Sequence, residues 1–314
     1  MVVSTGSTSE GRGSTSEGRG STSGGRGSTS GGRGSTSDGR GSTGEVVVER
    51  DDRRLSAWRG VSRQYDYWWT VYKRTWKSSV VTSFLSPFLY VVAMGVLLGG
   101  FVHSEPSQLE GASSYLAFIV PGLIAAQAMQ TAVLETTYPV MGALKWHKSF
   151  YAQLASPLEP RDLANAMLAF TLFRVGSTCG VYFLVMAPFG VFATWWGPLL
   201  AWLTTMLVGM AFAVWTFAFS AHIRSEASFG LIFRLGLIPL FLFSGSFFPI
   251  SNLGSGLEWV AKITPLWHGV NLTRMLCLDH VDAVTGLVNV LVLAGVLGVG
   301  WWLAIRTLER RLAQ

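Results

Sequence analysis

Charged residues are scarce in this sequence. Only 13% of the 314 residues are Asp, Glu, Lys or Arg and 49% are hydrophobic, whereas a soluble domain carries about 25% charged residues. This deficit argues against an ordinary soluble protein and indicates a chain that lies in a bilayer. The net charge of +6 does not indicate nucleic-acid binding, because Lys and Arg cluster beside apolar runs instead of forming a separate basic face.

Cysteine is scarce as well. Cys179 and Cys277 are too few for a disulfide framework, and Cys179 falls within a long apolar run, so nothing follows about the redox compartment. The N-terminus has no apolar signal-peptide core. We therefore expect the first membrane span to serve as the insertion signal, without cleavage.

Motifs of catalysis are missing. The chain has no GxxxxGK[ST] loop, no HExxH pair, no GxSxG elbow and no metal-spaced Cys/His cluster. We therefore expect no catalytic residue, no metal and no cofactor in this chain, and transport against a gradient would need energy from a partner. The histidines are scattered, and we expect each to have a plain interfacial role: His103, His147, His222, His268 and His280.

Glycine, serine, threonine and arginine dominate the first part of the chain. Residues Gly6 to Gly44 repeat a seven-residue unit, GSTSEGR and its variants, without a large apolar residue. Such a segment cannot bury enough surface to offset its ordering entropy, so we expect residues 1–44 to be a disordered tail. It is either a basic tail that touches anionic lipid or repeat DNA translated from a start placed too far upstream.

Residues 45–79 are rich in charged and aromatic residues. Trp and Tyr rings prefer the headgroup zone and Lys and Arg prefer the anionic inner leaflet, so this region is predicted to be a cytoplasmic amphipathic helix. The alternative is that it is only the flank of the first span.

Long apolar runs follow. A membrane helix needs about 20 mostly apolar residues, and we predict an all-α polytopic protein whose domain, residues 80–306, has six spans before a cytoplasmic tail, 307–314. The predicted spans are Val80–Val102, Tyr115–Tyr138, Leu163–Phe189, Trp196–Ala221, Phe229–Phe248 and Gly286–Ala304.

Lysine and arginine set the orientation. They concentrate before the first span, after the second, after the fourth and at the C-terminus, whereas the opposite segments hold only Lys262 and Arg274. The positive-inside rule then places both termini in the cytoplasm. The inner turn with His222, Arg224 and Glu226 is interpreted as solvated.

Polar residues recur inside two predicted spans. The second carries a stripe of Gln127, Thr131 and Glu135, with Gln130 beside it, and the third carries Arg174. A charge at that depth needs a partner, a cavity or water. Depth from the expected helix ends favours Gln127 and Gln130 as neighbours of Arg174, although a downward-reaching arginine also approaches Glu135. The seam either holds the helices together or lines a substrate path.

Two segments resemble a known family. GALKWHKSFYAQLASPLEPRDLANAM resembles the first cytoplasmic loop of ABC-2 type export permeases, and SGSFFPISNLGSGLEWVAKITPLWHGVNLTRML resembles their extracellular hairpin before the last span. The preceding ETTYP and the KW pair resemble the branch that contains the nodulation-factor permease NodJ and the daunorubicin-resistance permease. In the hairpin we expect short amphipathic helices broken at Pro249, Gly254 and Pro265, which either dip into the outer leaflet as a re-entrant hairpin or cap the membrane core. We single out Phe248, Pro249, Pro265 and His268.

The resemblance implies a bacterial inner-membrane permease that pairs with a second permease copy and with separate ATPase subunits, which would bind ATP and Mg. It also implies that the loop after the second span couples to the ATPase. The positions carried over are Lys145, Trp146, Tyr151, Leu154, Pro157, Leu158, Arg161 and Asp162. Physically, Pro157 and Pro160 would stiffen a turn, Leu154 and Leu158 have the spacing of one helical face, and Arg161 can pair with an acidic partner. The alternative is a plain solvated turn.

The sequence thus predicts the membrane-spanning subunit of an ABC exporter, not an enzyme. Its expected substrate is amphipathic: a lipo-oligosaccharide, a polysaccharide intermediate or glycolipid, or a lipophilic drug. The alternatives are an intramembrane lipid-linked transferase, whose acids would need motif spacing that Glu105, Glu110, Glu258, Asp279 and Asp282 lack, and a passive channel.

Overall fold

A computed structural model of the chain describes residues 111–155, 158–250 and 254–313, with single residues before them: Tyr65, Trp69, Thr70, Lys73, Leu85, Leu89 and Ala93. All of them belong to one compact unit, Asp52–Gln314. The predicted tail, 1–44, lies outside the described residues, as does Pro157. So do the amphipathic region, 45–79, and the first span, Val80–Val102, apart from those single residues.

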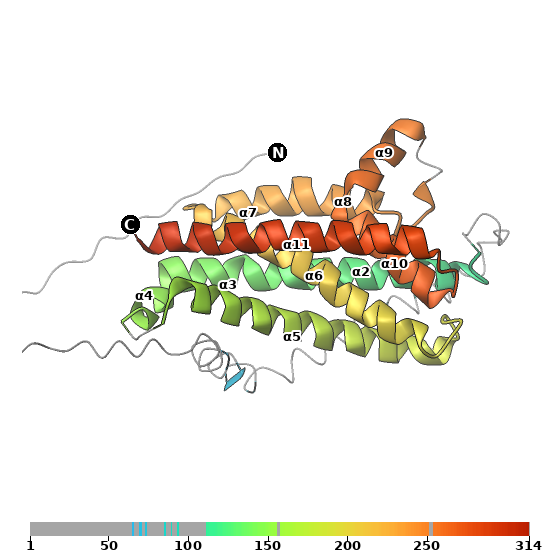
Figure 1. Cartoon of the computed structure of the whole chain (residues 1–314), viewed down its shortest axis with the longest axis horizontal. Coiled ribbons are helices and arrows are strands. Elements are labelled where there is room, and N and C mark those ends of the chain that lie inside the picture. The colour runs from blue at the N-terminus through green and yellow to red at the C-terminus, as the bar shows by residue number, and fades with distance from the viewer. Residues whose placement is uncertain are drawn as a thin grey trace, which may run out of the picture. The chain divides into compact units, whose positions relative to one another are not determined.

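Every regular element in the described ranges is a helix (Figure 1). In chain order they are α2 Tyr115–Thr136, α3 Tyr138–Met141, the π-helix η3 Gly142–Trp146, α4 Ser149–Gln153, α5 Pro160–Met186, the 3-10 helix η4 Ala187–Phe189, α6 Gly197–His222, α7 Ala227–Leu231, the π-helix η5 Ile232–Leu237, α8 Ile238–Phe243, α9 Ser255–Ile263, α10 Pro265–Cys277 and α11 Ala283–Leu312.

Four helical runs in the described part are long and apolar enough to cross a membrane: Tyr115–Trp146, Pro160–Phe189, Gly197–His222 and Ala283–Leu312. They contain the predicted second, third, fourth and sixth spans almost entirely, so the chain is an all-helical membrane protein in its described part. The predicted fifth span is shorter than expected, an apolar helix over Ala227–Phe243. It ends there because Ser244 Oγ donates to Phe241 O and the next residue, Gly245, has a φ of +80°. The count of six spans stays a prediction.

The run that begins with α2 is longer than expected. Thr137 interrupts it, but α3 and η3 carry the helical backbone on to Trp146. The cause is packing, because Val140, Met141 and Leu144 are buried. The segment that we expected to be a loop in water is therefore partly a buried continuation of the helix, and the true turn begins near His147.

Helix α6 lies at the centre of the bundle and packs against α2, α5, α10 and α11. Its contact with α11 depends on Gly300. A Cβ at this position would overlap Val214 Cγ2 and lie 2.7 Å from Trp215 Nε1. The α6–α11 contact therefore requires a residue without a side chain at Gly300.

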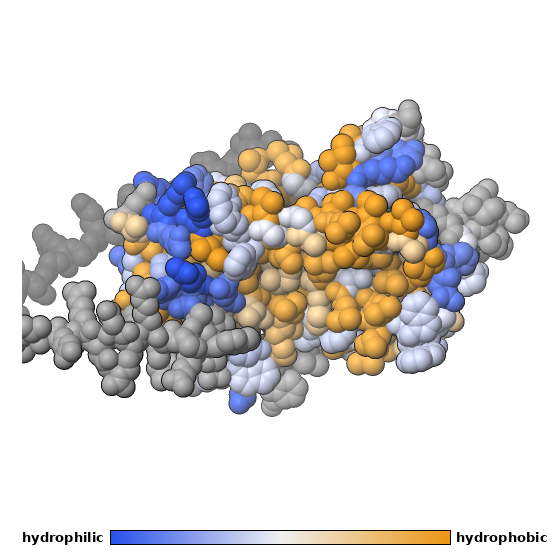
Figure 2. Space-filling view, in the orientation of Figure 1, coloured by the Kyte–Doolittle hydropathy of each residue, from blue (hydrophilic) through white to orange (hydrophobic). Residues whose placement is uncertain are grey.

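The surface of the bundle is banded. In Figure 2 apolar surface covers the middle of the helices, and hydrophilic surface gathers at the end where α11 finishes and at the opposite end. Helix α11 contributes much of the apolar surface, since only 22% of its most apolar stretch is buried. Helices that expose apolar faces along their length are typical of a protein surrounded by lipid.

The segment before α11 forms two helices, α9 and α10. Gly254, with a φ of +78°, precedes α9, and Pro265 occupies the first turn of α10, where Thr264 Oγ1 accepts a hydrogen bond from Trp267 N at 3.3 Å. The predicted breaks at Gly254 and Pro265 are therefore present. Helix α10 packs on α2, α6 and α11, whereas α9 exposes Trp259 and Ile263. Its place in the outer leaflet stays a prediction.

Candidate functional site

The turn after η3 is built around a buried anchor and two exposed aromatic rings. Lys148 adopts a left-handed conformation with a φ of 49° and reverses the chain into α4. Phe150 is buried in the main core, whereas Trp146 and Tyr151 are 48% and 41% exposed. A short segment held by one buried phenylalanine thus presents aromatic surface at the end of the bundle.

Two segments at the same end of the bundle meet through Glu226. Its Oε1 accepts from Lys145 Nζ at 2.9 Å and from Trp146 Nε1 at 3.1 Å. These two hydrogen bonds, that of Lys145 first, lower the pKa of the Glu226 carboxyl below its ordinary value. Glu226 therefore ties the turn between α6 and α7 to the end of η3. His222, Arg224 and Glu226 are exposed, which agrees with our interpretation of this turn as solvated. The Glu226 carboxylate in addition meets two donors from a segment about 80 residues earlier, a contact that the sequence did not indicate.

Leu154 and Leu158 do not share one helical face. Helix α4 ends at Gln153, and Leu158 precedes α5 in non-helical backbone. The reason is Pro160, which begins α5 and keeps Glu159 in an extended conformation. Both leucines are half-buried against the chain's own core. The aromatic rings of Trp146 and Tyr151, rather than a leucine knob, provide most of the apolar surface that a partner could reach.

Arg161 and Asp162 are already engaged within the chain. Arg161 Nε lies 2.7 Å from Glu159 Oε2 in an exposed ion pair. Asp162 is 6% exposed, and its Oδ2 accepts from Glu159 N at 3.1 Å in a capping box at the start of α5. Asp162 therefore acts as a structural cap, and Arg161 would have to exchange an internal partner for an external one.

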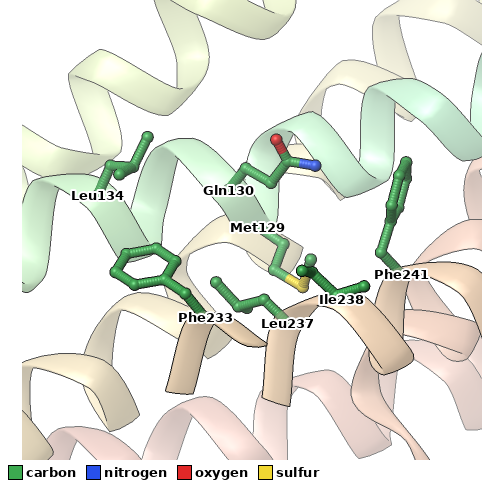
Figure 3. Close-up of a pocket in the computed structure, with 7 residues that line it drawn as sticks. All are labelled: Met129, Gln130, Leu134, Phe233, Leu237, Ile238 and Phe241. Carbon is green, nitrogen blue, oxygen red and sulfur yellow. The ribbon is translucent and has the colours of Figure 1, made fainter. Parts of the chain in front are cut away.

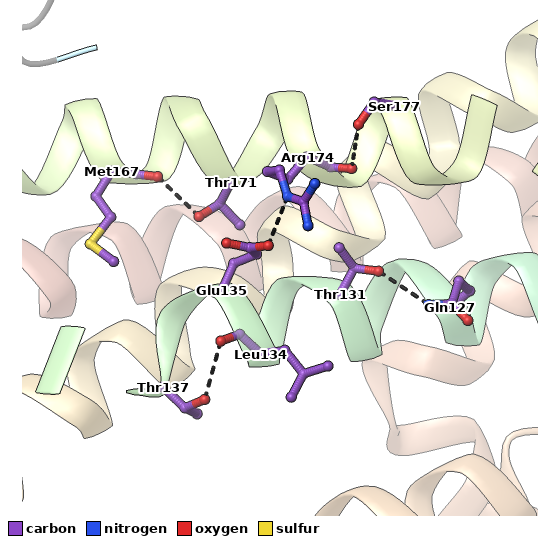
Figure 4. Close-up of polar contacts among 9 residues, drawn as sticks. All are labelled: Gln127, Thr131, Leu134, Glu135, Thr137, Met167, Thr171, Arg174 and Ser177. Carbon is purple, nitrogen blue, oxygen red and sulfur yellow. Dashed lines mark hydrogen bonds and ion pairs between the residues drawn. The ribbon is translucent and has the colours of Figure 1, made fainter. Parts of the chain in front are cut away.

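Arg174 and Glu135 form an ion pair between α5 and α2 (Figure 4). Arg174 Nε lies 2.8 Å from Glu135 Oε1, and the side chains are 18% and 21% exposed. The depth argument that favoured Gln127 and Gln130 is wrong. It measured depth from a helix end near Tyr138, whereas the helical run reaches Trp146, which puts Glu135 deeper and nearer the level of Arg174.

The glutamines of the predicted seam face different surroundings. Gln127 Nε2 donates to Thr131 Oγ1 at 3.2 Å within α2. Gln130 lines a pocket of about 350 Å³ between α2 and the η5–α8 run (Figure 3). The other lining residues are apolar: Met129, Leu134, Phe233, Leu237, Ile238 and Phe241.

Two residues of α10 have roles that sequence reasoning missed. Arg274, which we counted as a loop charge, is 5% exposed. Its guanidinium donates to Gly245 O at 2.6 Å and Phe118 O at 3.3 Å, and it stacks over the Phe118 ring at 3.9 Å. His268, expected to be interfacial, is buried, and its Nδ1 lies 2.7 Å from Asn289 Oδ1 on α11. In the sequence, this burial was indicated only weakly, by the position of the α10 segment beside apolar runs.

The remaining hairpin residues that we singled out lie close to these contacts in the chain. Pro249 is buried and Phe248 is half-buried, next to the Gly245 turn that Arg274 binds. Among the residues that the structure describes, no three His, Cys, Asp or Glu side chains gather as a metal site would require.

Comparison with known proteins agrees with this architecture. The sequence model of the ABC-2 type transporter family matches residues 65–278. The chain is 28% identical to nodulation protein J of Rhizobium leguminosarum bv. trifolii over 220 residues, which cover 68% of this chain and 82% of the relative. It is 26% identical to nodulation protein J of Neorhizobium galegae over 275 residues, 86% of this chain and all of the relative. With a family match over more than half of its length, the chain belongs to the ABC-2 type transporter family.

Proposed function

We propose that the chain is the permease subunit of an ABC exporter that moves an amphipathic substrate out of a bacterial cell. A separate ATPase subunit would bind ATP and Mg, and two permease copies would form the pathway. The observation that carries this proposal, beside family membership, is the tie that Lys145 and Trp146 make to Glu226 at one polar end of a bundle of membrane-length helices.

A coupling surface has to transmit movement to the helices. The turn after η3 meets this requirement, because it continues the α2 run and is anchored by buried Phe150. The contact with Glu226 joins the same turn to the chain between α6 and α7. A push on exposed Trp146 or Tyr151 would therefore reach two helical runs at once, whereas a free loop would absorb it.

The proposed substrate class rests on the character of the α2–α8 pocket. Its walls are apolar apart from the Gln130 amide. Such a lining suits an acyl chain or another lipophilic group with one polar contact. A lipo-oligosaccharide, a glycolipid or polysaccharide intermediate, and a lipophilic drug share this requirement, and the similarity to nodulation protein J favours the first.

The orientation follows from charge. The proposed coupling turn and the C-terminal end of α11, with Arg306, Arg310 and Arg311, carry the cations that the positive-inside rule assigns to the cytoplasm. The protein would then be a multi-pass inner-membrane protein with both termini in the cytoplasm.

The test is reconstitution with the ATPase subunit that co-purifies from gently solubilised membranes. Trp146→Ala combined with Tyr151→Ala should lower substrate-stimulated ATP hydrolysis about tenfold or more, as expected when an aromatic hot-spot pair is removed, without loss of folded protein. The matched control, Trp195→Ala, removes an aromatic ring that is 87% exposed between α5 and α6.

The control should keep the stimulation within a factor of about two, since isolated surface substitutions have small effects. Equal stimulation in both variants would remove the coupling role. A transferase would instead modify a lipid-linked acceptor without the ATPase, and a channel would conduct without ATP, so either result would replace the export proposal.

A further inference from the structure

A basic pocket lies between the α6–α7 turn and the end of α11, apart from the Glu226 contact. Its volume is about 600 Å³. The cationic side chains that line it are Arg224 from the turn and Arg310 and Arg311 from the last turn of α11, with His222 at the end of α6. Among the described lining residues, none has a carboxylate side chain.

Hydroxyl groups line the same pocket. Ser225 and Ser228 come from the α6–α7 turn and the start of α7, and Thr307 comes from α11. Guanidinium groups bind phosphate oxygens through paired N–H donors, and hydroxyl groups add further donors. The lining is therefore chemically suited to a phosphate group.

The pocket lies at the level expected for lipid headgroups. Trp301 and Trp302 on α11 are about half exposed, and tryptophan rings prefer the boundary between hydrocarbon and headgroups. Thr307 follows Trp302 by five residues, which is about 8 Å along the helix. Hydrophilic surface gathers at this end of α11, beside the apolar band (Figure 2).

Apolar surface continues from the pocket toward the membrane. Trp215 lies seven residues before His222, two turns away on the same face of α6, and is 43% exposed. Leu231, one turn after Ser228, is 62% exposed. A lipid whose headgroup occupies the basic pocket would therefore place its acyl chains against these exposed apolar side chains. An acidic protein surface in the same pocket would make no use of them.

We propose that this pocket binds the phosphate-bearing headgroup of an anionic membrane lipid. Basic pockets between membrane helices on the cytoplasmic side bind such headgroups. The bound lipid would bridge the α6–α7 turn and α11 at the end of the bundle that carries Glu226. The inference is independent of the transported substrate and of the ATPase.

The test measures binding of short-chain phosphatidylglycerol and phosphatidylcholine to the full-length chain in mild detergent, by native mass spectrometry. Arg310→Gln with Arg311→Gln should weaken phosphatidylglycerol binding about tenfold or more, because each cation near a lipid surface contributes about 1 kcal/mol. Phosphatidylcholine binding should not change. The matched control, Lys148→Gln with Arg306→Gln, removes two cations from the same end outside the pocket lining and should change binding by less than about threefold.

A second variant removes no cation. Ser228→Asp, at a half-buried position, adds a negative charge to the pocket and should also weaken phosphatidylglycerol binding, with the thermal midpoint confirming the fold. Equal weakening in the control pair would show general surface attraction and overturn the proposal, as would unchanged binding in Arg310→Gln with Arg311→Gln.

Two further measurements distinguish a lipid headgroup from the other possible occupants of the pocket, free phosphate and a protein surface. Inorganic phosphate alone should bind more weakly than phosphatidylglycerol, because it lacks the acyl contacts, and tighter binding of phosphate would overturn the lipid assignment. Loss of ATPase association with unchanged lipid binding in Arg310→Gln with Arg311→Gln would identify the pocket as a protein-docking surface instead.

Discussion

Arg174 on α5 and Glu135 on α2 meet at 2.8 Å although 39 residues separate them in the chain. Both residues lie in helical runs that are long and apolar enough to cross a membrane. A pair of opposite charges in such surroundings is costly to break, because the remaining charge loses its partner in a medium that solvates it poorly.

The first prediction concerns this pair. Arg174→Met and Glu135→Met should each destabilise the fold by about 1–2 kcal/mol, the upper range for polar contacts between membrane helices, and the double substitution should recover most of the loss. Thermal unfolding in detergent measures this cycle. Additive losses would show that the two charges do not stabilise each other. Normal stability with lost export in the double variant would place the pair on the substrate path.

The second prediction concerns the tie at Glu226. Lys145→Glu and Glu226→Lys should each lower the substrate export obtained per ATP hydrolysed, and the combined charge exchange should restore part of it, since the ion pair is re-formed in reverse. The comparison uses reconstituted complexes at one salt concentration, because exposed pairs are screened. A combined variant no better than the worse single one would exclude the ion pair as the coupling contact.

The same contact predicts a pH dependence. The pKa of Glu226 is lowered in the folded protein, so its contribution to stability is fully present above the unfolded value, about 4.3, and is lost as the pH falls through the folded value. The difference in thermal midpoint between the wild type and Glu226→Gln should be constant from about pH 7 to pH 5.5 and shrink below about pH 4. A difference that grows as the pH falls would contradict the assigned sign.

The third prediction concerns Arg274. Arg274→Met leaves the carbonyls of Phe118 and Gly245 without their donor and should destabilise the protein by about 2–4 kcal/mol. Arg274→Lys should recover only part, because a single ammonium cannot reach both acceptors in the same fork geometry. Lys262→Met on α9 removes a half-buried surface cation paired with Glu258 and should stay within about 0.5 kcal/mol. The thermal unfolding midpoints of the three variants decide whether the burial of Arg274 or its charge determines the loss of stability.

The fourth prediction concerns two glycines of α11. Gly300→Ala should cost about 1–3 kcal/mol, the range for overpacking, because the new Cβ meets Val214 and Trp215. Gly298→Ala meets nothing within 4 Å and should be neutral or slightly stabilising, since alanine favours the helix. Chemical denaturation measures both. Equal effects would mean that α11 does not pack on α6 at Gly300.

The fifth prediction concerns orientation. A single engineered cysteine at exposed Lys148 should react with a membrane-impermeant thiol reagent only after the cells are opened, whereas one at Lys262 should react in intact cells. Cys179 and Cys277 are buried and give little background. Labelling of Lys148→Cys from outside would remove the basis of the proposed coupling surface.

The apolar runs were readable because a membrane span must satisfy all of its backbone groups within one helix and cover about 30 Å of hydrocarbon. Four of the predicted spans therefore correspond to α2, α5, α6 and α11. The breaks at Gly254 and Pro265 were readable for the same local reason, since glycine permits a positive φ and proline favours a first helical turn.

The contacts between side chains of different helices could not be predicted from the sequence in the same way. Depth counted from an assumed helix end placed Glu135 too near the surface, because buried Val140, Met141 and Leu144 extend the helical run beyond it. The spacing of Leu154 and Leu158 suggested one helical face, but α4 ends at Gln153 and Leu158 lies outside any helix. In both cases an error of a few residues in an element boundary changed which side chains meet.

The sequence by itself determined that this protein lies in a lipid bilayer, that it is helical, to which family it belongs and which helical runs carry its polar residues. It could do so because hydropathy and backbone hydrogen bonding act locally along the chain. Only the tertiary structure decided that Glu226 holds Lys145 and Trp146, that Arg174 meets Glu135, and that Arg274 is buried against Phe118. Those pairings depend on how helices distant in the chain pack around α6, and the free energy of a contact depends on that packing rather than on residue spacing.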